Sequence, residues 1–301
     1  MNRSFRTVLI VARHELADSV RSRRVLVMVL LYLAGSIAAT AIFISVLQKI
    51  EGQLVTSLGI APSGKTGNVT ATLWKSDAFR QILVHLMGDR GLAESLLSIP
   101  PLGLFYGWLS FAFAPLLVML TSSTRVSEEI WSGSVRFVLF RIPRLQWVFG
   151  KFAGQSVQLF GALLLSAAGA WFTGLFRMHS FEPAATAQAM VLFSVKAWIY
   201  SLAFLGLATA ISQFCAGPNL AVAMGFLALI GMSIVSGVSE HFAGDGLRRI
   251  WDAVNVVTPE SHRMNLWWGD AAHFAPAVVF LLTLSVLYLL SGYARFSRRN
   301  L

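Results

Sequence analysis

The sequence predicts an all-α polytopic membrane protein with six transmembrane helices, and three observations support this. Of its 301 residues, 56% are hydrophobic and 13% are charged, whereas soluble domains carry about 25% charged residues. The mean hydropathy is +0.67. The charged residues gather in clusters between long apolar stretches. This composition excludes a disordered chain, a collagen and a soluble enzyme, and a single cysteine, Cys215, excludes an internal disulfide framework.

Six apolar stretches approach or exceed the roughly 20 helical residues that cross a bilayer core about 30 Å thick. Five of them carry no charge, and the fourth contains only Lys196. The predicted spans of this single membrane domain are residues 25–47, 102–122, 152–175, 189–214, 220–237 and 274–291. Because the number of spans is even, both chain termini are expected on the same side of the membrane.

The distribution of charge predicts which side that is. If both termini are cytoplasmic, the inner segments are 1–24, 123–151, 212–219 and 294–301, with fourteen Lys or Arg and four acidic residues. The longer outer segments, 48–101, 176–188 and 238–273, hold nine basic and ten acidic residues. This bias predicts a multi-pass protein of the inner (plasma) membrane with cytoplasmic termini. The basic clusters flank spans, so we expect membrane lipid as a partner and no nucleic acid.

Residues 4–22 are expected to form a helix that lies along the membrane before the first span. Its apolar residues recur at helical spacing and are Phe5, Val8, Leu9, Ala12, Leu16 and Val20, while Arg6, Arg13, Asp18 and Arg21 occupy the other side. A helix with these two faces suits the headgroup region of a bilayer.

The inner segment 123–151 predicts a short, partly apolar helix on the cytoplasmic face. Ser127 can cap its start, and Glu128 and Glu129 suit a helix N-terminus. Pro143 should end or redirect the chain that precedes it. The apolar residues between these signals are too few to span and too many for a solvated loop, so this surface is expected to bind a partner.

The two long outer segments differ in character. Residues 48–101 combine irregular chain around 59–68 with an amphipathic helix around 79–87. Residues 238–273 are apolar enough to predict short helices at the outer membrane interface, with Trp267 and Trp268 at the level of the headgroups.

One motif would make the chain an ATPase, and its context argues against that function. Residues 59–66, GIAPSGKT, fit the phosphate-binding pattern G-x-x-x-x-G-K-T. The motif needs a buried strand before it and a helix after it, whereas Gly67 and Asn68 follow here in an outer segment. The six histidines have no metal-binding spacing. We therefore expect no catalytic, cofactor-binding or metal site, and no enzyme activity in this chain.

Lys196 is the one ionisable residue inside a predicted span, and such residues are functional candidates by default. Its stretch is longer than lipid requires, so the favoured interpretation is that its ammonium group reaches the outer headgroups. Three small-residue pairs, Gly103–Gly107, Ala34–Ala38 and Gly206–Ala210, allow close helix packing, which we expect within one bundle rather than between copies.

The segment from Ser127 to Phe152 resembles the permease subunit of type-2 ABC transporters. That family shows E-x-x-x-G-T, an apolar stretch, a proline with an arginine, and G-K at the start of the third span. The matching residues are Glu129, Gly133, Pro143, Arg144, Gly150 and Lys151. Ser134 replaces the usual threonine, and the stretch from Pro143 to Lys151 is shorter than is usual in the family.

The resemblance extends over nearly the whole chain and implies an exporter permease without an ATPase of its own. It implies two cytoplasmic ATPase subunits that bind ATP and magnesium, and a second permease copy or half. The helix at residues 1–24 would be an elbow helix, and the segment 123–151 would hold a coupling helix. The residues expected at the ATPase interface are Arg13, Glu15, Arg21, Glu128, Glu129, Gly133, Arg136, Arg141, Pro143 and Arg144.

Other functions stay open at this point. A stand-alone channel or ion-coupled carrier would use Lys196 as its central residue, but the spans offer no acidic partner for it. A mechanical transducer that moves no solute would have the same architecture. The sequence also leaves open an accessory protein outside the cell, the substrate, and whether the permeases pair as identical or different chains.

Overall fold

The computed structural model describes residues 3–57, 90–178, 181–241 and 258–299. This part is helical without strands, and six of its helices are long and apolar enough to cross a membrane. The elements are α1 (Arg3–Arg21), α2 (Arg23–Ser57), α5 (Arg90–Leu97), α6 (Pro101–Ser122), α7 (Arg125–Ser132), α8 (Val135–Leu139), α9 (Arg144–Arg177), α10 (Pro183–Phe214), α11 (Pro218–His241), η1 (Pro259–His262), η2 (Met264–Leu266) and α13 (Ala271–Ser297). The predicted fold class is therefore confirmed, and the motif at 59–66 and the helix expected at 79–87 lie outside the described residues.

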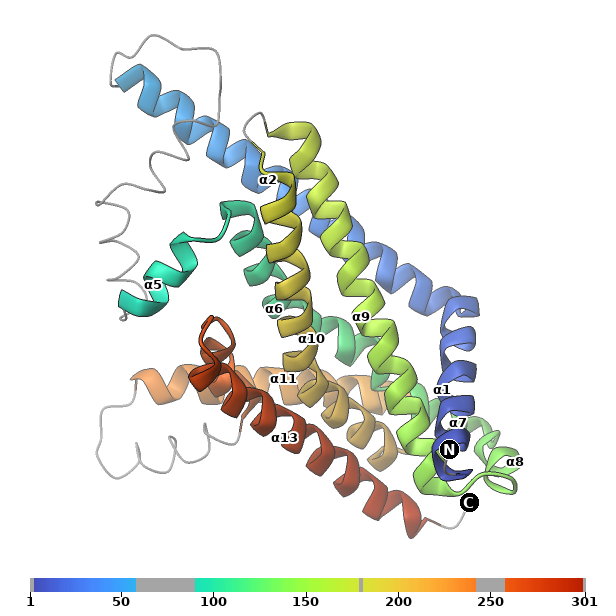
Figure 1. The fold of residues 1–301 in the computed structure, drawn as a ribbon. Coiled ribbons are helices and arrows are strands. Elements are labelled where there is room, and N and C mark those ends of the chain that lie inside the picture. The colour runs from blue at the N-terminus through green and yellow to red at the C-terminus, as the bar shows by residue number, and fades with distance from the viewer. Residues whose placement is uncertain (1–2, 58–89, 179–180, 242–257, 300–301) are drawn as a thin grey trace.

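Helix α10 is at the centre of the bundle and contacts α6, α9 and α13, while α2 packs on α9 and α6 (Figure 1). In α6 and α10, 67% of the most apolar stretch is buried inside the chain, against 17% in α2 and 11% in α11. The outer helices α2 and α11 thus present most of their apolar surface to the surroundings.

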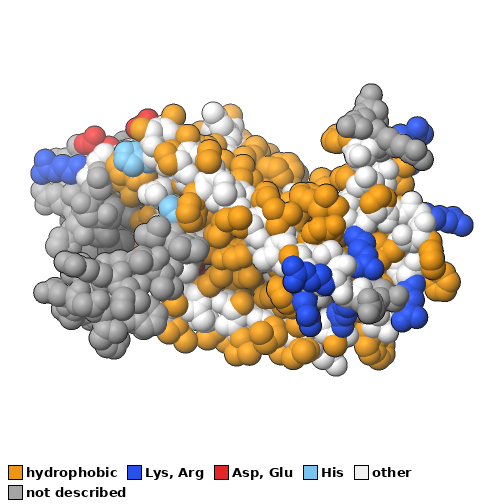
Figure 2. Space-filling model, turned by 90° about the horizontal axis from the view of Figure 1, so that it is seen from below, with side chains coloured by type: hydrophobic (Ala, Val, Ile, Leu, Met, Phe, Trp, Pro, Cys, Tyr) orange, Lys and Arg blue, Asp and Glu red, His pale blue; other side chains and the backbone are white. Residues whose placement is uncertain are grey.

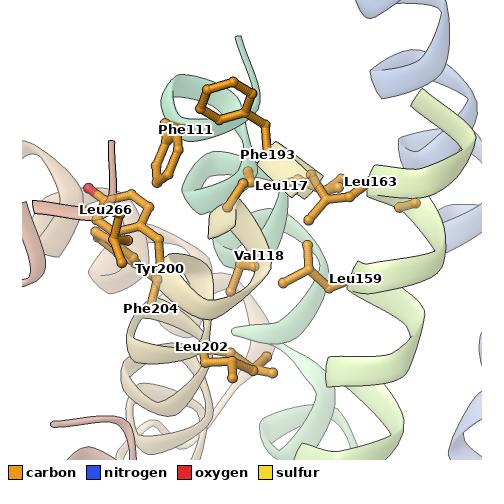
Figure 3. Packing of buried hydrophobic residues seen from close by; sticks show 14 of the residues in the cluster. Phe111, Leu117, Val118, Leu159, Leu163, Phe193, Tyr200, Leu202, Phe204 and Leu266 are labelled. Carbon is orange, nitrogen blue, oxygen red and sulfur yellow. The ribbon is translucent and has the colours of Figure 1, made fainter. Parts of the chain in front are cut away.

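The core forms where α6, α9 and α10 meet. Figure 3 shows side chains from all three helices pointing toward one another, with Leu266 of η2 next to Tyr200. A buried hydroxyl in this region has its hydrogen bonds satisfied: Tyr106 donates to the carbonyl oxygen of Leu163 at 2.7 Å, and its oxygen is 3.1 Å from Oγ of Ser194. Buried polar groups in a membrane bundle need such internal partners.

Small residues bring the central helices together, as expected for two of the three pairs. A Cβ on Gly107 would lie 2.8 Å from the ring of Phe193 on α10, and one on Gly206 would strike the backbone of Ser285 on α13. The third pair differs, because Ala34 and Ala38 are exposed on α2. Packing inside this chain therefore explains the pairs on α6 and α10 and does not explain the pair on α2.

Helices α1, α7 and α8 and both chain ends lie at the same end of the bundle, which we call the terminal face (Figure 1). The opposite end, the distal face, carries α5, η1 and η2. Figure 2 shows Lys and Arg side chains gathered at the terminal face and a belt of hydrophobic side chains across the middle of the molecule.

Candidate functional site

The candidate site is the terminal face, where α7 and α8 lie between α6 and α9. The first N–H groups of a helix lack partners within it. In α7, the N–H groups of Val126 and Ser127 donate to Oγ of Ser212 on α10, at 3.0 and 2.9 Å. The expectation that Ser127 caps this helix is wrong, because Ser127 lies inside α7 and donates to the carbonyl oxygen of Thr124. The bundle itself therefore holds the start of α7.

Gly133 separates α7 from α8 and has a left-handed backbone with φ 74°. Residues with a side chain rarely adopt this conformation, and it ends helices efficiently when glycine is present. A Cβ at this position would meet nothing within 4 Å. Within this chain the glycine is thus required by the backbone turn and not by close packing.

One side of the two short helices is packed and the other is bare. Val126 and Val135 are fully buried and belong to a small cluster with Trp147 of α9 and Phe296 of α13. The outer side exposes three aromatic residues, Trp131 at 74%, Phe137 at 78% and Phe140 at 87%. We call these three residues the aromatic surface. Arg136 and Arg141 are exposed beside it.

Behind α7 lies a group of charged and polar side chains, the charge cluster, formed by the buried Glu15, Arg125, Lys151 and Gln155 and by the partly exposed Glu129. Lys151 of α9 contacts Glu15 of α1 at 2.7 Å and Glu129 of α7 at 2.5 Å. Glu15 also accepts a hydrogen bond from Gln155 at 3.2 Å and lies 3.9 Å from Arg125. Glu15 and Lys151 are 4% and 3% exposed, so their charges neutralise each other inside the protein.

Two glycines of α9 allow α1 to approach closely enough for these contacts. A Cβ on Gly150 would lie 2.5 Å from Val11, and one on Gly154 would lie 2.8 Å from Cβ of Glu15 and 2.9 Å from the carbonyl oxygen of Ala12. The face of α1 that packs on α9 therefore contains Glu15, whereas Phe5, Leu9 and Val20 of its apolar stripe are exposed.

The neighbours of Glu15 offset the effect of burial on its carboxylate. Burial disfavours the carboxylate and acts to raise its pKa, but Lys151 and Arg125, together with the hydrogen bonds from Lys151 and Gln155, outweigh this effect and hold the pKa of Glu15 below its ordinary value. Glu15 is therefore ionised at neutral pH.

The other residues expected at an ATPase interface lie in different surroundings. Glu128 pairs with Arg24 at 2.8 Å, and Arg13 and Arg21 are exposed on α1. Pro143 precedes α9, and Arg144 donates to carbonyl oxygens at the end of α13, those of Phe296, Ser297 and Arg299. These contacts describe the isolated chain, and the role of each residue toward a partner stays a prediction.

Three residues of this site had no functional role in the sequence interpretation: Arg125, Gln155 and Ser212. Their partners lie on helices that are distant in sequence; Gln155 and Glu15, for example, are 140 residues apart. The sequence feature that could have indicated two of them is polarity, because Gln155 and Ser212 interrupt apolar stretches. Lys151 had entered only through the family resemblance.

Lys196 lies elsewhere, near the distal face. Its ammonium group donates to the carbonyl oxygen of Trp268 at 3.0 Å and lies 5.6 Å from the ring centres of Phe193 and Phe274. The residue is 5% exposed, and within this chain its charge is satisfied by a backbone carbonyl. The reach of its ammonium group to the outer headgroups stays a prediction. Lys196 ties α10 to the segment before α13.

Metal binding finds no support in the part of the chain that the structure describes. There, no three His, Cys, Asp or Glu residues lie together in a way that could hold an ion. The charge cluster mixes carboxylates with a lysine and an arginine, whose positive charges disfavour a cation.

Comparison with known proteins gives one match over almost the full length. The model of a family described as ABC-2 family transporter protein matches residues 9–301. A comparison with curated proteins gave no match.

Proposed function

Because this chain belongs to the ABC-2 family of transporter proteins, we propose that it exports a substrate through the plasma membrane with energy from separate ATPase subunits. As an ABC permease it would supply the path, and two cytoplasmic ATPases that bind ATP and magnesium would supply the work. The cytoplasmic ends of its helices would receive the movement of the ATPases and tilt the spans.

The observation that carries the proposal is the aromatic surface. Trp131, Phe137 and Phe140 are more than 70% exposed on helices whose other side is buried. Apolar patches of this kind mark interaction sites, and aromatic residues dominate the energetics of protein interfaces. A groove on an ATPase that covers these side chains would stabilise the complex by about 1.5–3 kcal/mol for each ring that is fully buried.

The charges of the same face support a cytoplasmic orientation. Lys and Arg gather at the terminal face (Figure 2), and cytoplasmic loops are the ones enriched in these residues. Helix α1 would then lie at the inner headgroups as an elbow helix, with its exposed Phe5 and Leu9 in lipid and Arg13 and Arg21 toward phosphates or the ATPase.

The partner's charge can be proposed as well. Glu128 and Glu129 already pair with Arg24 and Lys151, whereas Arg136 and Arg141 have no ion pair among the described residues and stand beside the aromatic surface. An acidic rim around an apolar groove on the ATPase would complement this surface.

A second permease copy or half would complete the path. The apolar stretches of α2 and α11 are 17% and 11% buried, so each has a wide face available for lipid or for another copy. Ala34 and Ala38 on α2 would allow close approach of two helices there.

Affinity purification of the tagged chain from its own cells tests the proposal. The wild-type chain should retain an ATP-binding subunit, and the double variant F137A/F140A should lose at least about 100-fold in affinity for it, since each tenfold corresponds to about 1.4 kcal/mol. F176A is the matched control, because Phe176 is 82% exposed on α9 at the distal face. A wild-type chain without an ATPase, or equal loss in both variants, would refute the docking surface.

A further inference from the structure

The charge cluster connects three helices that have different roles in the proposed function. Glu15 is on the expected elbow helix α1, Glu129 is on α7 beside the aromatic surface, and Lys151 is at the start of the span α9. The ammonium group of Lys151 contacts both carboxylates, at 2.7 and 2.5 Å. Lys151 thus joins α7, which carries part of the aromatic surface, to α1 and to its own helix α9.

Charged side chains are the main link between α1 and α7. Their backbones have little direct contact, whereas α1 packs closely along α9. Arg125 of α7 reaches α1 at three side chains, lying 3.3 Å from Oγ of Ser19, 3.5 Å from Asp18 and 3.9 Å from Glu15. Together with Lys151, it ties α7 to one side of α1.

Helix α1 in turn leads directly into the first span. It ends at Arg21 and α2 begins at Arg23, so only Ser22 separates them, and it takes part in both helix ends: its N–H donates to O of Asp18, and its carbonyl oxygen accepts from N of Leu26. A displacement of α1 would therefore be passed to α2, while Lys151 belongs to α9 itself. Movement of α7 can reach two spans through the cluster.

All four acidic residues of the segments that we expect in the cytoplasm take part in this arrangement or border it. Glu15, Asp18 and Glu129 contact Lys151 or Arg125, and Glu128 pairs with the neighbouring Arg24. A strongly basic face thus places its few acids at the junction of α1, α7 and α9. Such placement has a cost, since charges are desolvated there, and a purely apolar contact would have sufficed for packing.

We propose that Glu15 and Lys151 are positioning residues: their buried ion pair, together with the contact of Lys151 with Glu129, makes α1 and α7 move as one unit when an ATPase acts on the aromatic surface. This inference rests on the proposed function and goes beyond it, because it assigns the route by which the movement reaches α2 and α9. Neither residue touches the ATPase in this mechanism.

Spin-label distances between helices test the route. On a C215S background, which removes the one native cysteine, labels are placed at exposed positions: Ala17 of α1, Ser132 of α7 and Ala294 of α13. The complex of the full chain with its co-purified ATPase is reconstituted in nanodiscs and measured without nucleotide and with ATP and orthovanadate. Retention of the ATPase by each labelled protein is checked first.

In the wild-type complex, nucleotide should shift the distance from Ser132 to Ala294 and leave the distance from Ala17 to Ser132 unchanged. The double variant E15Q/K151M removes the Glu15–Lys151 pair as a whole, and the carboxylate that loses its cation, Glu129, is 32% exposed. In this variant nucleotide should shift or broaden the distance from Ala17 to Ser132. K151R, which keeps a cation, should behave as the wild type.

Two results would overturn the inference while leaving the proposed function intact. One is a nucleotide-dependent change between Ala17 and Ser132 in the wild type as large as that between Ser132 and Ala294. The other is an unchanged distance from Ala17 to Ser132 in E15Q/K151M while α7 still moves relative to α13. If nucleotide changes the distance from Ser132 to Ala294 in neither the wild type nor the variants, the proposed function is refuted, and so is the inference that rests on it.

Discussion

Two lysines are buried among the residues that the structure describes, and their surroundings differ. Lys151 at the terminal face contacts two carboxylates, whereas Lys196 near the distal face contacts a backbone carbonyl and two aromatic rings. Both are at most 5% exposed. Lys151 neutralises carboxylates that other helices contribute. Lys196 has no carboxylate beside it in the described part of the chain, and its own charge is stabilised by the carbonyl oxygen and the rings. A buried lysine is therefore informative about function through its partners more than through its burial.

The largest effect is expected for K151M. The substitution removes the cation between Glu15 and Glu129 and leaves Glu15 buried with Arg125 at 3.9 Å. Breaking one side of a buried ion pair costs about 3–5 kcal/mol, so the free energy of unfolding in detergent should fall by about that amount. The double variant E15Q/K151M should lose less than K151M alone. A fully stable K151M would remove the distinction between the two lysines.

A smaller effect is expected where α1 meets α9. In G154A the added methyl group would lie 2.9 Å from the carbonyl oxygen of Ala12 and 2.8 Å from Cβ of Glu15. Such overpacking costs typically about 1–3 kcal/mol, and it should loosen the pair between Glu15 and Lys151. G161A is the control on the same helix, because a Cβ at Gly161 meets nothing within 4 Å. Thermal unfolding of both variants checks this, and equal stability would argue against close packing of α1.

K196M is expected to cost less than K151M, about 1.5–3 kcal/mol for a lost hydrogen bond from a charged donor. The substitution leaves no carboxylate without its partner, since the acceptor is the carbonyl oxygen of Trp268. The effect should be local, with faster hydrogen exchange in residues 264–268 and normal exchange in α7. A loss of stability equal to that of K151M, or faster hydrogen exchange in α7, would contradict the expected difference between the two lysines.

The smallest effect concerns pH. Because the folded protein holds the pKa of Glu15 below the ordinary 4.5, the ionised group stabilises the fold above that value, and this contribution is lost as the pH falls through the lowered pKa. The difference in melting temperature between wild type and E15Q should therefore be constant near neutral pH and shrink under acid. A difference that grows under acid would contradict the assignment of Glu15 as an ionised partner.

The sequence was sufficient for the six spans, because each depends on a local run of apolar residues whose length the bilayer fixes. It did not predict the break between α7 and α8, because the segment 123–151 was expected to hold one short helix and Gly133 entered only through the family resemblance. The spans depend on residues that are neighbours in the chain.

The charge cluster could not be predicted in the same way. Apart from Lys151 and Glu129, its pairs join residues more than a hundred positions apart, such as Lys151 and Glu15. Which faces of two helices meet is decided by packing. The apolar stripe of α1, which was expected to face the membrane, did not show which residues pack on α9, since Phe5 and Leu9 are exposed while Ala12 and Glu15 are buried. A membrane-bound helix buries apolar residues in lipid, so within the protein its polar face can be the packed one.

Photo-crosslinking from the aromatic surface tests the function most directly. A photoreactive amino acid at Phe140, which is 87% exposed, should form a covalent product with an ATP-binding subunit in intact cells, and the same amino acid at Phe176 should not. Products from Phe140 with lipid or with other permease chains alone, or an ATPase captured equally from Phe176, would contradict docking at α7 and α8.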